Sequence, residues 1–138
     1  MSGADFLDTN VVVYAYDEGS PQKQEVARLL LKGGLSGKIV ISTQVLTEFA
    51  ATMLHKVSPP ATPDAVMRGL EALEAIRLIV ADGELVRRAV EAGAAYGIHF
   101  YDGMIVAAAE RAGCKRLLSE DFSAGQEYFG VTAVNPFR

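Results

Sequence analysis

The chain has 138 residues, half of them hydrophobic and 22% charged, a composition that favours a folded domain and argues against disorder. A single cysteine, Cys114, excludes an internal disulfide and a cysteine-rich zinc site, and the net charge of −4 offers no overall attraction to a phosphate backbone. The sequence lacks a secretion-signal pattern and any apolar run long enough to span a bilayer, so we expect a cytoplasmic protein without membrane attachment.

Short apolar segments alternate along the chain with segments of helical periodicity. The expected strands cover residues 5–7, 38–41, 77–80, 116–119 and 131–134. The expected helices cover residues 9–16, 21–33, 43–56, 62–76 and 83–96, and Asp102 heads a last one with a buried apolar run at 104–109. Ser20-Pro21 is typical of a helix start, and Pro59-Pro60 interrupts the chain. Alternating strands and helices predict one α/β domain, residues 1–138, with a mostly parallel sheet of about five strands covered on both faces.

Acidic residues follow several of the expected strands. Asp8 comes directly after the first, Glu48 lies about one turn into the helix after the second, and Glu120 and Asp121 follow the fourth. Asp102 stands at the start of the helix that leads to the fourth strand. Because parallel sheets place their ligands at the carboxyl ends of the strands, we expect these acids to meet at one edge.

Several carboxylates in one cleft repel one another unless some stay protonated or a cation compensates them. Oxygen ligands favour a hard divalent ion, Mg²⁺ or Mn²⁺, and such ions activate water for attack on a phosphodiester. Any one aspartate could instead cap a helix or form a turn, so the hypothesis rests on their convergence. Thr9, Asn10 and Ser119 could orient a metal ligand or could satisfy only local backbone groups.

Five segments, in order, resemble the motifs of PIN-domain ribonucleases and, within them, VapC toxins. They are Phe6-Leu7-Asp8-Thr9-Asn10-Val11, residues 42–49, Tyr101-Asp102-Gly103 with the run to 109, residues 117–122, and Val134-Asn135-Pro136-Phe137. The resemblance implies a three-layer α/β/α sandwich and a Mg²⁺- or Mn²⁺-dependent endoribonuclease.

The family's acidic quartet falls on Asp8, Glu48, Asp102 and Asp121, and Glu120 matches an acid often present there. The resemblance also implies an RNA substrate, the toxin role in a toxin–antitoxin pair, a cognate antitoxin and a homodimer. Tyr101 and Gly103 depart from the tryptophan and alanine that many relatives carry, which affects packing near Asp102 and removes no ligand.

Two alternatives remain open. A catalytically silent PIN-like interaction module is expected to lack at least one acid, and all four positions are filled here. A phosphatase or receiver domain that phosphorylates an aspartate needs a second acid after the first strand, where Asn10 stands.

The charge balance bears on the substrate. The formal charge of the four candidate ligands equals the whole net charge of −4, so the rest of the chain is formally neutral. Basic residues that could contact RNA are Lys38, Lys56, Arg87, Arg88, Lys115 and Arg116.

Overall fold

In the computed structural model, which describes residues 3–138, six strands form one sheet in the order β3-β2-β1-β4-β6-β5. The strands are β1 (Asp5–Leu7), β2 (Ile39–Ser42), β3 (Arg77–Ile79), β4 (Arg116–Leu118), β5 (Glu127–Tyr128) and β6 (Val131–Val134). All neighbours run parallel except β5, which pairs antiparallel with β6. The predicted, mostly parallel sheet is confirmed, and β5 adds a two-residue edge strand too short for any apolar pattern to indicate.

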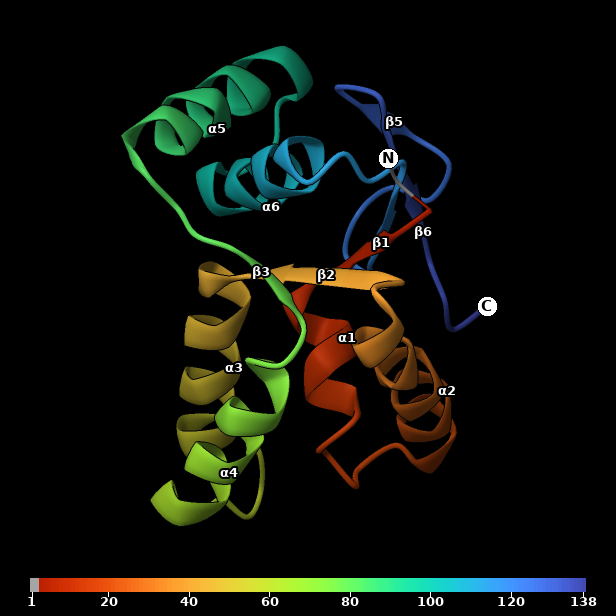
Figure 1. Ribbon diagram of the computed structural model, residues 1–138, viewed down its shortest axis with the longest axis vertical. Helices are drawn as coiled ribbons and strands as arrows, with labels where there is room; N and C mark the ends of the chain where they lie inside the picture. Colours follow the sequence, from red (N-terminus) through yellow and green to blue (C-terminus); the bar gives the residue numbers. More distant parts are fainter. Residues whose placement is uncertain (1–2) are drawn as a thin grey trace.

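Helices cover both faces of this sheet. They are α1 (Thr9–Tyr14), α2 (Pro21–Leu31), α3 (Thr43–His55), α4 (Pro63–Leu73), α5 (Gly83–Tyr96) and α6 (Phe100–Arg111), with a 3₁₀ turn at Lys32–Ser36. Figure 1 shows α5 and α6 on one side of the strands and α1 to α4 on the other. The chain is therefore the three-layer α/β/α sandwich that the sequence predicted.

The structure confirms the predicted start of α2 at Pro21 and shows that α6 starts earlier than predicted. The side chain of Ser20 makes no capping hydrogen bond to α2, which begins at Pro21 all the same because proline already has helical φ. Asp102 is the third residue of α6, because the ring nitrogen Nδ1 of His99 accepts a hydrogen bond from the Tyr101 backbone N–H at 3.1 Å and starts the helix earlier. His99 thus has the structural role of an N-cap.

The sheet centre and α6 form the core. Phe6 and Leu7 of β1 are fully buried, and residues 105–109 of α6 are at most 2% exposed. The predicted burial of the run 104–109 is therefore confirmed except at Met104, which is half-buried. Gly103 lets α6 approach α5 closely, since a Cβ there would lie 2.5 Å from the Ala89 carbonyl oxygen. The contact explains why this chain has glycine next to Asp102.

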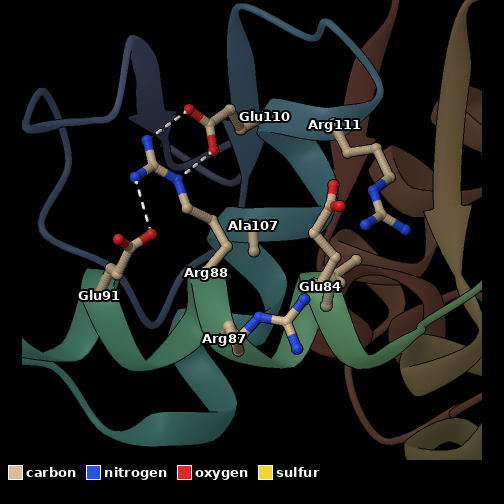
Figure 2. Close-up of a pocket in the computed structure, with 8 residues that line it drawn as sticks. Glu84, Arg87, Arg88, Glu91, Ala107, Glu110 and Arg111 are labelled. Carbon is tan, nitrogen blue, oxygen red and sulfur yellow. Dashed lines mark hydrogen bonds and ion pairs between the residues drawn. The ribbon is translucent and has the colours of Figure 1, made fainter.

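An arginine ties the outer helix α5 to α6. The Arg88 guanidinium donates two hydrogen bonds of 2.8 Å to the Glu110 carboxylate and one of 3.1 Å to Glu91, beside a surface cavity of about 630 Å³ (Figure 2). Its carbon Cζ also lies 3.6 Å from the centre of the Phe129 ring. A paired, stacked guanidinium is well suited to holding two helices in a fixed register.

Within residues 3–138, no helix combines the length and the apolar character needed to cross a bilayer.

Candidate active site

The buried polar residues of the described chain mark one edge of the sheet. Asp8, Ser42 and Ser119 are 6%, 3% and 1% exposed. Asp8 follows β1, Ser42 ends β2 and Ser119 follows β4. Since β1 lies between β2 and β4, all three residues stand at neighbouring carboxyl ends. The strand order reverses at β1, because β2 pairs with it on one side and β4 on the other. Open α/β sheets bind ligands at the carboxyl end of such a position.

Asp8 lies at the centre of this edge. Its Oδ1 accepts a 2.7 Å hydrogen bond from the Thr9 backbone N–H, which caps α1, and its Oδ2 accepts one of 2.8 Å from the Ser119 hydroxyl. Burial, with smaller contributions from the charges of Glu48 and Asp121, raises the pKa of Asp8 to about 6 despite these two bonds. The residue is therefore a helix cap, as the simpler interpretation expected, and also a carboxylate in an unfavourable electrostatic environment.

Glu48 is held at both carboxylate oxygens. The Thr9 hydroxyl donates to Oε1 at 2.6 Å, and the Gln44 amide donates to Oε2 at 3.2 Å. Thr9 therefore bridges Asp8 and Glu48 through its backbone and its side chain. No sequence motif indicates a role for Gln44, although its position one helical turn before Glu48 is compatible with this contact.

Asn10 makes the corresponding bridge to Asp121. Its Nδ2 lies 3.3 Å from Asp8 Oδ2, 3.0 Å from Asp121 Oδ2 and 3.1 Å from the Ser119 hydroxyl. Its Oδ1 accepts a 3.3 Å hydrogen bond from the Glu120 backbone N–H. One uncharged amide thus stands between two carboxylates and holds the segment after β4 against α1.

Asp102 belongs to the same electrostatic cluster. It lies exposed on the first turn of α6. Partial burial raises its pKa, the nearby His99 ring lowers it, and the charges of Asp121 and Glu48 raise it again, with a net upward shift. Glu48 and Asp121 therefore lie close enough to act electrostatically on both Asp8 and Asp102.

Glu120 stands apart from this cluster. Its carboxylate accepts hydrogen bonds from the Tyr14 hydroxyl and, at 2.8 Å, from the Lys23 ammonium. The Lys23 ammonium also lies 4.8 Å from the centre of the Tyr14 ring. Burial raises the pKa of Glu120, yet the Lys23 and Tyr14 bonds outweigh it and leave the pKa below its usual range. Lys23 is far away in sequence, and no pattern indicated its role.

The donor chemistry suits a hard divalent cation. The ligands on offer are carboxylate oxygens, and both charges that act on Asp8 are negative. Across residues 3–138, no three histidine, cysteine, aspartate or glutamate side chains converge into a preformed metal-binding group.

A cavity of about 670 Å³ opens beside the acids. Its lining includes Glu48, Asp121 and Lys56. Lys56 is thus the predicted basic residue that shares a cavity with the acids. Two other predicted RNA contacts have ion-pair partners elsewhere. Arg88 pairs with Glu110, and Arg116 pairs with Asp5 at 2.6 Å.

The chain resembles known proteins in sequence and in fold. The PIN domain family profile matches residues 6–124. A toxin–antitoxin complex from Klebsiella pneumoniae has a similar fold, with TM-score 0.68, 18% identity and coverage of 96% of this chain and 98% of that chain. FitAcB from Neisseria gonorrhoeae gives TM-score 0.66, 20% identity and coverage of 96% and 98%.

A sarcin–ricin loop cleaving VapC toxin of Mycobacterium tuberculosis gives TM-score 0.69, 17% identity and coverage of 94% of this chain and 99% of that chain. No curated protein matches this sequence. At these identities the solved structures establish a shared fold.

Proposed function

Since this chain belongs to the PIN-domain family, we propose that it is a divalent-metal-dependent endoribonuclease that hydrolyses RNA phosphodiester bonds. The observation that carries the proposal is the proximity of acids from four distant segments, since the charges of Glu48 and Asp121 act on both Asp8 and Asp102. Ion pairs within residues 3–138 neutralise five other acids and none of these four. Acids that form no ion pair at this edge of the sheet suit a site completed by a cation.

Asp8, Glu48, Asp102 and Asp121 are the residues that would hold Mg²⁺ or Mn²⁺. A bound divalent ion supplies water of lowered pKa and stabilises negative charge on a phosphate.

The surrounding polar residues orient the acids. Thr9 fixes Asp8 and Glu48 relative to each other, and Asn10 and Ser119 do the same for Asp8 and Asp121. Such hydrogen bonds keep metal-binding carboxylates in a fixed orientation. Lys56, in the same cavity, is placed to attract the RNA backbone.

We further propose that the chain is the toxin of a toxin–antitoxin pair. The support is its fold, which it shares with a toxin–antitoxin complex and with a VapC toxin over nearly the whole length of each. The partners are then an RNA substrate and a cognate antitoxin protein.

We also propose a single domain over residues 1–138 that forms a homodimer in the cytoplasm, and light scattering of the purified protein tests the dimer.

The test of the nuclease is cleavage of a panel of structured and single-stranded RNAs. Purified protein should cut RNA with Mg²⁺ or Mn²⁺ and stop in EDTA. Asp8→Asn should abolish cleavage while the protein remains folded by circular dichroism. Glu71→Gln, an equal charge change on the exposed side of α4, is the matched control and should cut at the wild-type rate.

Cleavage by Asp8→Asn at the wild-type rate would contradict the assignment of that residue. Absence of both metal binding by calorimetry and RNA cleavage would favour the catalytically silent interaction module. A stable acyl-phosphate after treatment with acetyl phosphate would instead favour a phosphorylated aspartate.

A further inference from the structure

A second, smaller cavity lies on the other flank of Glu48. It encloses about 420 Å³, and its lining includes Thr43, Gln44, Thr47, Tyr101 and Met104. We call it the Tyr101 cavity. Glu48 lines both this cavity and the larger one described above. Whatever occupies the Tyr101 cavity therefore sits directly beside the acids.

An exposed aromatic ring forms one wall. Tyr101 is 55% exposed, although it directly precedes Asp102 on α6. The His99 ring lies nearly parallel to it, with ring centres 5.6 Å apart and an angle of 23° between the planes. The backbone carbonyl of Tyr101 accepts a 3.0 Å hydrogen bond from Gln44. The Tyr101 backbone is thus fixed relative to Glu48 while much of the ring remains open to a ligand.

Unused hydrogen-bonding capacity lines the same cavity. Gln44 Oε1 is the buried side-chain polar atom of residues 3–138 that has no hydrogen-bond partner. The Thr43 hydroxyl oxygen accepts from the Ala81 backbone N–H at 3.3 Å, so its own proton is free to donate. The Thr47 hydroxyl donates to the Thr43 carbonyl at 2.9 Å, which leaves its oxygen able to accept. A buried acceptor without a partner is costly, so its presence calls for a function.

We propose that the Tyr101 cavity binds one nucleobase of single-stranded RNA, with the Tyr101 ring as stacking surface and Gln44 as a polar contact to the base edge. An aromatic face combined with a few donors and acceptors is how proteins bind unpaired bases. That the base belongs to the nucleotide next to the cleaved phosphate rests on the proposed nuclease function. The cavity itself would bind a base whether or not the acids support cleavage.

The probes are the four ribonucleoside 5′-monophosphates, with ribose 5-phosphate as the control that lacks a base. In ¹⁵N-labelled full-length protein, the nucleotides should shift the amide signals of residues 43–47 and 101–104, and ribose 5-phosphate should not. Tyr101→Ala should weaken nucleotide binding about tenfold, the loss typical of one stacked base. Tyr101→Phe keeps the ring and should bind as the wild type does. Leu35→Ala, at an exposed apolar residue in the 3₁₀ turn, is the control substitution.

A cleavage experiment places the base relative to the reaction. On an oligoribonucleotide that the protein cuts, Tyr101→Ala should lower kcat/KM about tenfold. The loss should disappear when the base at the stacked position is replaced by an abasic nucleotide, because the ring then has nothing to bind.

The outcomes separate the two proposals. Equal binding of nucleotides by wild type and Tyr101→Ala, or equal shifts with ribose 5-phosphate, overturns the base subsite even when the protein cleaves RNA. Nucleotide binding that depends on Tyr101 in a protein that cuts no RNA supports the subsite and overturns the nuclease.

Discussion

Replacement of Asp8 by asparagine is expected to stabilise the metal-free protein. The fold raises the pKa of the Asp8 carboxyl from 3.8, its value in an unfolded chain, to about 6, and burial is the largest cause. Between these values the folded state binds more protons, so the free energy of unfolding falls as the pH rises. This loss in the free energy of unfolding is absent well below pH 3.8 and complete above pH 6.

The size of this penalty follows from the pKa shift. It amounts to about 3 kcal/mol at pH 7.5 and about 1 kcal/mol at pH 4.5. An amide at this position keeps an oxygen to accept from the Thr9 N–H, while its NH₂ group replaces the Oδ2 that accepts from the Ser119 hydroxyl and the Asn10 amide, and so weakens both contacts. The net gain for Asp8→Asn should be about 2 kcal/mol at pH 7.5, which raises the melting temperature by roughly 8 °C in a chain of this size.

The assay is urea unfolding in EDTA at pH 4.5 and 7.5, followed by circular dichroism. The advantage of Asp8→Asn should shrink by about 2 kcal/mol on going to pH 4.5. Saturating Mg²⁺ should then stabilise the wild type more than the variant, because only the wild type gains a neutralised carboxylate. Glu71→Gln is the charge control. A variant less stable than the wild type at pH 7.5, or a difference that ignores pH, would refute the electrostatic argument.

Two other substitutions test particular contacts. Gly103→Ala should lower the free energy of unfolding by about 1–3 kcal/mol, because its Cβ would meet the Ala89 carbonyl oxygen at 2.5 Å. A Cβ at Gly83 would make only an ordinary contact of 3.8 Å with the Arg87 guanidinium, so Gly83→Ala should be neutral in the same urea assay. Glu120→Gln should keep the Mg²⁺ concentration for half-maximal RNA cleavage within about twofold of the wild type, since the Glu120 carboxylate faces Lys23; a loss above tenfold would make it a metal ligand.

Most of the fold was predictable because a parallel sheet requires short apolar strands that alternate with helices, and the sequence has this pattern. Each of the five expected strands is present, and the family resemblance is confirmed by the PIN profile over residues 6–124. What escaped prediction depends on contacts rather than on pattern. The strand β5 has two residues, too few for periodicity, and it exists because it pairs with β6.

The site was predictable to the level of which acids share an edge. Strand order and carboxyl ends suffice to bring Asp8 and Asp121 together, and the structure places the Asn10 amide within hydrogen-bonding distance of both. The partners of Glu120 were not predictable, since Lys23 lies on α2 and reaches it only in the folded chain. The roles of the four acids in metal binding stay a prediction that the proposed cleavage assay tests.

The net charge shows why composition alone misleads about the substrate. Five acids of residues 3–138 are paired with lysine or arginine, namely Asp5, Asp82, Glu91, Glu110 and Glu120. The four acids of the site have no such partner, and two of them have raised pKa values. A chain total of −4 would repel RNA if it were spread over the surface. Under the proposed function, the same charge concentrated at one edge would bind a divalent cation first, so RNA binding should strengthen with Mg²⁺ and weaken in EDTA.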